Sequence, residues 1–167
     1  MREHELMNKL KIFADNLFVH ETLHFSSGIA MFFLINSFFG KPILGIIAFL
    51  VSLFIDADHY LEGLVYNHFK IGWIFTTYPH IYWRKTGKIT ILLHSWELLV
   101  LIMIFGKIFN FLPLAVAIVL PAMLHYLIDT IVYCSFKKLP LLQYFLIYRI
   151  FNRFDLNKAK GDTDIRY

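Results

Sequence analysis

Residues 111–133 read FLPLAVAIVLPAMLHYLIDTIVY, an apolar run in which His125 and Asp129 are the notable polar interruptions. A helix needs roughly 20 predominantly apolar residues to cross a bilayer, and this run has that length. Hydrophobic residues make up 58% of the 167-residue chain and charged residues only 17%, whereas soluble domains have about 25% charged residues. The run therefore predicts a transmembrane helix in an integral membrane protein; an unusually apolar soluble helical protein is the alternative.

Three shorter apolar stretches precede this run. Gly40-Lys41-Pro42 predicts a tight turn between the first two, with Gly ending one helix and Pro beginning the next. Gly106-Lys107 predicts a second turn, which leads into the run at 111–133. The fold class is therefore all-α, an integral membrane four-helix bundle made of two helical hairpins. The three shorter stretches are residues 25–39, 42–55 and 89–105.

Further amphipathic segments flank the predicted bundle. Residues 1–16 place leucines and a phenylalanine at spacings of three and four, which predicts a short amphipathic helix and not a cleavable signal peptide. Residues 141–154 predict a helix lying on the membrane interface, and the aromatic content of 62–88 suits the same interface. We expect one membrane-embedded domain over residues 1–160, followed by a polar tail at 161–167.

The distribution of basic residues predicts the orientation in the membrane. Of the 16 Lys and Arg residues, only Lys41 and Lys107 fall in the two hairpin turns. By the positive-inside rule, both termini and the central loop of this multi-pass protein then lie on the cytoplasmic side of the cell (inner) membrane. The chain has no long basic run, so nucleic acid is not an expected partner. The single cysteine excludes an intramolecular disulfide and a Cys-rich zinc site.

Histidines and aspartates gather at the predicted cytoplasmic ends of all four stretches. His125 and Asp129 are four residues apart, as are His20 and His24 at the start of the first stretch, so the members of each pair share a helix face. Such pairs on facing helices are a common way to build a metal site in a bundle. A carboxylate in an apolar span costs about 2.5–3.5 kcal/mol on insertion scales, and a divalent metal would offset this cost for Asp129. The candidate residues are His20, His24, Asp56, Asp58, His59, His94, His125 and Asp129.

Each of these residues also has an interpretation without metal. A single histidine at a helix end is usually an interfacial polar residue. Asp56 and Asp58 are suited to capping a helix, and His125 with Asp129 is suited to a buried hydrogen-bonded pair. The convergence of all four stretches at one depth favours a metal site. Mixed His and Asp ligands favour zinc and are compatible with manganese or iron, with one or two ions bound.

The order of these motifs resembles the YdjM-type family of membrane-bound, metal-dependent hydrolases. The motifs are His24-x-x-x-Gly28, Asp56-x-Asp58-His59, His94-Ser95 and His125-x-x-x-Asp129, and the resemblance covers about residues 20 to 135. It implies metal-ligand roles for His24, Asp56, His59, His94, His125 and Asp129, and a ligand or base role for Asp58. Family members often carry a further His and Arg before the third motif, which this chain lacks. His20 and Glu97 are extra polar groups suited to fill that gap.

The expected function is hydrolysis of a phosphoester, with lipid-linked molecules among the candidate substrates, at the cytoplasmic face. Asp58 or Glu97 would accept the proton of a metal-bound water. A non-enzymatic membrane scaffold with a structural metal is the alternative. A metal-ion carrier is a third hypothesis, and the almost wholly apolar outer halves of the stretches argue against it. The lipid bilayer is the expected partner.

Overall fold

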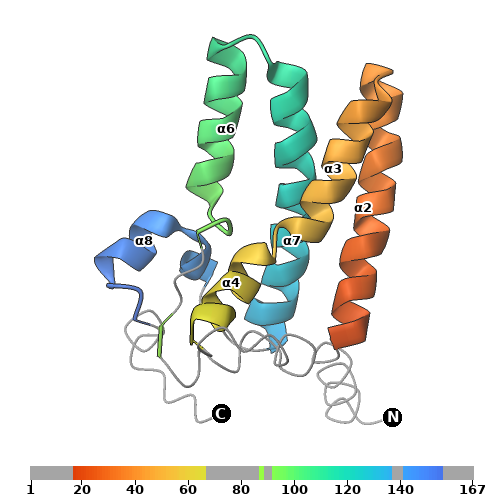
Figure 1. Cartoon of the computed structure of the whole chain (residues 1–167). Helices are drawn as coiled ribbons and strands as arrows, with labels where there is room; N and C mark the ends of the chain where they lie inside the picture. The colour runs from red at the N-terminus through yellow and green to blue at the C-terminus, as the bar shows by residue number, and fades with distance from the viewer. Residues whose placement is uncertain (1–16, 67–86, 89–91, 137–140, 156–167) are drawn as a thin grey trace. The chain divides into compact units, whose positions relative to one another are not determined.

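The computed structural model describes residues 17–66, 87–88, 92–136 and 141–155, which are predominantly helical (Figure 1). Among these residues, the β-type pairing is an isolated antiparallel bridge between Lys88 and Asp155. The predicted all-α class is confirmed, whereas the predicted helix at residues 1–16 lies outside the described residues. The elements are α2 (Leu17–Phe39), α3 (Pro42–Phe54), α4 (Ala57–Tyr66), α6 (Trp96–Ile108), α7 (Leu112–Phe136), the 3-10 helix η2 (Leu141–Tyr144) and α8 (Leu146–Phe151).

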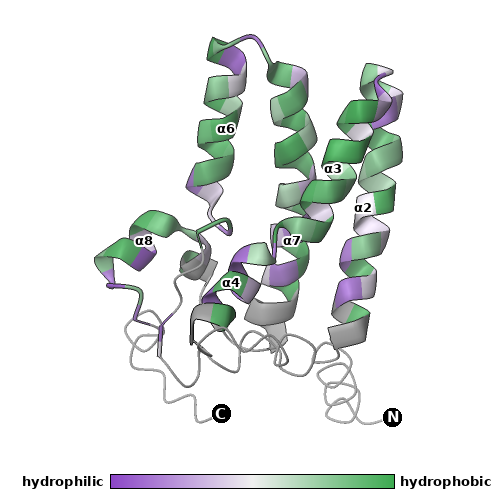
Figure 2. Cartoon of the chain, in the orientation of Figure 1, coloured by the Kyte–Doolittle hydropathy of each residue, from purple (hydrophilic) through white to green (hydrophobic). Residues whose placement is uncertain are grey.

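Three helical stretches are long and apolar enough to cross a membrane: Glu21–Phe39, Pro42–Glu62 and Leu112–Ile131. Figure 2 shows hydrophobic residues along α3 and α7 and hydrophilic ones towards the N-terminal end of α2. Many of the apolar side chains point outward; Phe33 is 64% exposed and Phe38 is 74% exposed. An apolar surface of this extent requires an apolar environment. The chain is therefore a membrane protein.

Helix α6 is shorter than the predicted third span. The apolar stretch begins at residue 89, but the helix begins at Trp96 and has 13 residues. At 1.5 Å per residue it is about 20 Å long, against about 30 Å for a bilayer core. The preceding residues 92–95 are not helical, because tertiary partners use the backbone groups of Leu93 and His94.

The chain forms two compact units. Unit 1 comprises residues 1–54 and 99–138, and unit 2 comprises residues 55–98 and 139–167. The expectation of a single domain with a polar tail stays a prediction, and the tail lies outside the described residues.

The described part of unit 1 forms two antiparallel helical hairpins whose turns lie at the same end (Figure 1, top). Gly40 makes the first turn with a left-handed φ of 61°, and its N–H donates to the Asn36 carbonyl at 2.8 Å. The second turn was predicted at Gly106-Lys107, but both residues belong to α6. Asn110, with a φ of 57°, makes the turn instead. Asparagine tolerates this conformation better than most non-glycine residues, so it ends the helix where no glycine is present.

Small residues allow the helices of unit 1 to approach closely. A side chain at Gly28 would meet Phe49 and Ser52 of α3 at 3.1 Å, and one at Gly106 would overlap the Ala115 side chain of α7. The core between α2, α3 and α7 is formed by Ile35, Leu44, Ala48 and Ala117. The close approach of α6 and α7 beside their turn therefore leaves no room for a side chain at residue 106.

Replacing Gly106 with leucine is expected to destabilise the protein by about 1–3 kcal/mol, the usual cost of overpacking. Leucine favours a helix more than glycine does, so a loss of stability must come from the clash with Ala115. Unfolding in detergent, followed by tryptophan fluorescence, measures the change. Val100→Leu is the matched control, since Val100 is 58% exposed on the same helix. Equal stability of the two variants would contradict the packing described.

The described part of unit 2 contains α4, residues 87–88 and 92–98, η2 and α8. The predicted interfacial helix over 141–154 is divided into η2 and the six-residue α8. Within it, Tyr144 and Arg149 are buried, whereas Phe151 is 83% exposed. The apolar side chains of α8 therefore face outward, and its arginine faces the interior of the unit.

Candidate metal centre

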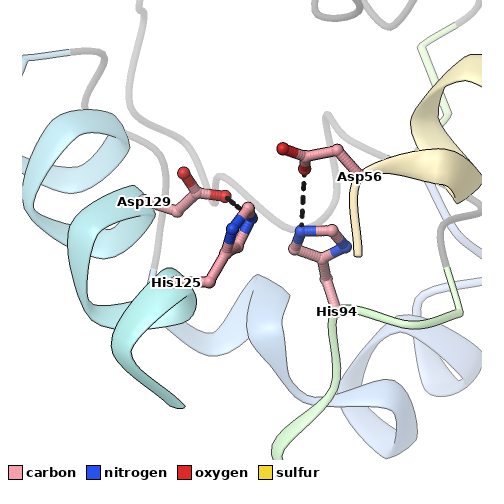
Figure 3. Close-up of side chains that lie close together, drawn as sticks. All are labelled: Asp56, His94, His125 and Asp129. Carbon is pink, nitrogen blue, oxygen red and sulfur yellow. Dashed lines mark ion pairs between the residues drawn. The ribbon is translucent and has the colours of Figure 1, made fainter. Parts of the chain in front are cut away.

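Asp56, His59 and His94 of unit 2 turn three donor atoms towards one another. Oδ1 of Asp56 lies 3.3 Å from Nε2 of His59 and 3.2 Å from Nε2 of His94. The two Nε2 atoms are 3.4 Å apart. Figure 3 shows the contact between Asp56 and His94. Both histidines are almost completely buried, so these contacts are shielded from water.

This triangle has the size of one face of a tetrahedral metal site. Metal bonds of about 2.0–2.1 Å to histidine nitrogen and carboxylate oxygen place neighbouring ligand atoms about 3.3–3.4 Å apart. The three distances in unit 2 are 3.2, 3.3 and 3.4 Å. The three side chains can therefore hold a divalent metal without a large rearrangement.

The interruption of the helix between α3 and α4 positions two of the three donors. The Asp56 carbonyl accepts the N–H groups of His59 at 3.0 Å and of Tyr60 at 3.4 Å, so Asp56 occupies the N-cap position of α4. His59 then lies three residues further on the same helix face. His94 comes instead from the non-helical residues 92–95, where the Ser95 hydroxyl donates to the Leu92 carbonyl at 3.3 Å.

Asp58 lies on the opposite side of the His94 ring. Its carboxylate is 3.3 Å from Nδ1 of His94 and accepts the Leu93 N–H at 2.8 Å. Metal-binding histidines usually donate their second ring nitrogen to such a carboxylate, which fixes the tautomer and orients the ring. The structure thus gives Asp58 an orienting position, and its role as a base stays a prediction.

The two carboxylates create a negative field around the His94 imidazole. Burial by itself would lower the pKa of His94, but hydrogen bonds to Asp56 and Asp58 and their charges outweigh burial and raise the pKa to about 9. The same field favours any cation at this position. The electrostatics of unit 2 therefore suit a positively charged occupant.

A second group of donors lies in unit 1, where His24 of α2 meets His125 and Asp129 of α7. Oδ1 of Asp129 is 3.6 Å from Nε2 of His24, and Oδ2 is 3.4 Å from Nε2 of His125. The two imidazole rings stack with centroids 3.9 Å apart. Figure 3 shows the pair formed by His125 and Asp129. All three side chains are buried, so the carboxylate is shared between two imidazoles in an apolar surrounding.

The structure brings together seven of the eight candidate metal residues, in two groups. Asp56, Asp58, His59 and His94 meet in unit 2, while His24, His125 and Asp129 meet in unit 1. The His125/Asp129 pair expected from the i,i+4 spacing is formed, and Asp56 lies close to His59, three residues further along the chain. His20 belongs to α2, but its side chain lies outside the described part of the chain. The expectation that all four stretches contribute to one common cluster stays a prediction. The donor atoms of Asp58, His59 and His94 in unit 2 lie close enough together that they could hold a metal ion.

Glu97 and Arg149 have positions that the sequence did not reveal. Both carboxylate oxygens of Glu97 accept backbone N–H groups at 3.0 Å, from Leu146 and Ile147 at the start of α8. Burial would raise the pKa of Glu97, but these amide donors outweigh it and hold the pKa below its usual value. The Arg149 guanidinium donates to the His94 carbonyl at 2.9 Å. The sequence signal for the role of Arg149 was a charged residue inside an apolar segment. An interfacial helix would show the same pattern, so the signal did not predict a buried arginine.

Comparisons with protein-family models, with curated proteins and with solved structures found no match. The resemblance to the YdjM-type family therefore rests on the four motifs alone.

Proposed function

We propose that this membrane protein is a metal-dependent hydrolase that acts on a phosphoester. The triangle of Asp56, His59 and His94 carries the proposal, because three buried donors lie at the mutual distances of tetrahedral metal ligands. Asp58 behind His94 completes the arrangement expected around a metal-binding histidine.

Among the described residues, the triangle in unit 2 has the number of protein donors that catalytic zinc sites use. Structural zinc sites use four protein ligands, whereas catalytic sites use three and leave a position for water or substrate. The triangle in unit 2 supplies three. We include His24, His125 and Asp129 of unit 1, which lie close together, as candidate ligands of a second ion.

When bound, a divalent ion polarises a phosphoryl oxygen and lowers the pKa of a coordinated water to near 7. Asp56, His59 and His94 would hold the ion, and Asp58 would keep the His94 ring in the metal-binding tautomer. Among the described residues, Lys88 is an exposed cation of the central loop suited to attract a phosphate group.

Zinc is the favoured metal, with manganese and iron compatible. We place the reaction at the cytoplasmic face of the cell membrane, following the positive-inside rule, with lipid-linked phosphoesters as candidate substrates.

The test combines metal analysis with an activity assay on the full chain in detergent. We expect elemental mass spectrometry to find at least one stoichiometric metal, and bis(p-nitrophenyl) phosphate or p-nitrophenyl phosphate to be hydrolysed. His59→Ala should lose both properties, whereas His68→Ala, outside the predicted cluster, should keep both. A bound metal without hydrolysis of either compound or of phospholipid vesicles would support the scaffold alternative. A wild type that is metal-free after chelator-free purification would show that these residues are buried hydrogen-bonded pairs and not metal ligands.

A further inference from the structure

Two side chains connect the His94 segment to α8 in opposite directions. Glu97, three residues after His94, accepts the first N–H groups of α8. Arg149 of α8 reaches back and donates to the carbonyl of His94. We call residues 141–155 the C-terminal strap. The strap is therefore attached to the segment 94–97 at two points, through contacts that span about 50 residues of sequence.

The burial of Arg149 is the reverse of what a simple surface helix would show. The arginine is 2% exposed, whereas Ile147 is 57% exposed and Phe151 is 83% exposed. A guanidinium stays charged in proteins, so its burial is costly unless its donors are satisfied. Helix α8 buries this cation and leaves Ile147 and Phe151 exposed. The contact with His94 is therefore a specific feature of the fold and not a by-product of hydrophobic packing.

The end of the strap is also held in place. Arg153 and Phe154 have left-handed φ values of 54° and 59°, and the Phe154 N–H donates to the Arg149 carbonyl at 2.7 Å. Asp155 then pairs with Lys88 in the isolated bridge. Backbone strain at two consecutive non-glycine residues persists only where the surroundings enforce it. The chain after α8 is thus turned back sharply, next to the residue that carries the contact.

The segment around His94 needs such external support because it is not part of a helix. Within it, the Leu93 N–H and the Nδ1 side of the His94 ring are held by Asp58. Arg149 holds the main-chain carbonyl of the same residue. One partner fixes the ring and the other fixes the backbone. Together they determine where Nε2 of His94 lies relative to Asp56 and His59.

We propose that Arg149 and Glu97 are positioning residues for the metal site, and that the C-terminal strap sets the metal affinity by fixing His94. This inference rests on the proposed metal site. Neither residue contacts the metal in this scheme, and both act through the backbone. Loss of an orienting partner at a metal site typically weakens metal binding by about 10- to 100-fold, and we expect a loss of that size when either end of the attachment is removed.

The experiment measures metal affinity on the full chain in detergent, by competition between the protein and a chromophoric chelator for Co²⁺ and Zn²⁺. The variants are Arg149→Met, which keeps most of the side-chain length without its donors, and Glu97→Gln. The second variant removes the charge of the carboxylate that accepts the first N–H groups of α8. Arg153→Met is the matched control, because it removes the same charge from an exposed arginine four residues away. The visible absorption of bound Co²⁺ reports the coordination geometry independently of affinity and of activity.

We expect Arg149→Met and Glu97→Gln to weaken Co²⁺ and Zn²⁺ binding by about tenfold or more and to alter the Co²⁺ spectrum. Arg153→Met should match the wild type, and Arg149→Lys should recover part of the affinity through its single remaining cationic donor group. Unchanged affinity and spectrum in folded Arg149→Met and Glu97→Gln, even with a lowered unfolding temperature, would show that the strap only stabilises the fold. That result would overturn this inference and leave the metal site intact, whereas a wild type that binds neither metal would overturn both.

Discussion

Replacing His94 with alanine is expected to abolish stoichiometric metal binding and phosphoester hydrolysis. His94 supplies one corner of the donor triangle, at 3.2 Å from Asp56 and 3.4 Å from His59. It also joins the triangle to Asp58 through its second ring nitrogen. Two remaining donors cannot replace three, so the loss in metal affinity should exceed the about 10- to 100-fold cost of losing an orienting partner. Elemental mass spectrometry and Zn²⁺ competition measure it.

A graded series separates binding from orientation in this site. Asp58→Asn keeps the shape of the side chain but removes the negative charge at Nδ1 of His94, so we expect an intermediate loss of about 10- to 100-fold. Ser95→Ala, next to His94, removes a hydroxyl that donates to the Leu92 carbonyl and should have a much smaller effect. Wild-type metal content in His94→Ala would show that the triangle is not the metal site.

Replacing Asp129 with alanine is expected to have the largest effect on stability, at about 3–5 kcal/mol, because it removes one partner of a buried polar cluster. The carboxylate bridges two imidazoles whose side chains, like its own, are at most 2% exposed. Without it, His24 and His125 would remain stacked in an apolar surrounding. Unfolding from mixed detergent micelles, followed by tryptophan fluorescence, gives the change in the free energy of unfolding.

Two comparisons make the Asp129 result interpretable. Thr130→Ala alters the next residue of α7 and should change stability by far less. Added Zn²⁺ should raise the unfolding midpoint of the wild type, because a ligand that binds only the folded state stabilises it. It should raise the midpoint less in Asp129→Ala if the unit 1 group holds an ion. Equal stability of Asp129→Ala and Thr130→Ala would contradict the importance of the buried cluster.

The predictions that the structure confirmed depend on local sequence. The length of the apolar run at 111–133 predicts a spanning helix because a bilayer has a fixed thickness, and α7 extends from Leu112 to Phe136. The spacing of His125 and Asp129 places them on one face because an α-helix has 3.6 residues per turn. The turn at Gly40 follows in the same way from the left-handed conformation that glycine adopts readily.

The predicted start of the third helix was wrong, because hydrophobicity alone did not define where the helix begins. Residues 89–105 are apolar throughout most of their length, yet α6 begins only at Trp96. Hydrophobicity does not show whether a backbone N–H will bond within its own helix or to a distant side chain. The Leu93 N–H bonds to Asp58, 35 residues away, and that choice is made by tertiary contacts.

The sequence by itself thus determined a helical membrane protein with a recurring set of histidines and aspartates, because bilayer thickness and helical periodicity act on neighbouring residues. Only the tertiary structure decided that Asp56 faces Nε2 of His94 while Asp58 faces Nδ1. The motif Asp-x-Asp-His is compatible with either assignment. Only the tertiary structure, too, revealed the attachment of His94 to Arg149. The physical reason is that both depend on how a non-helical segment packs against residues distant in the chain, and no local periodicity encodes such packing.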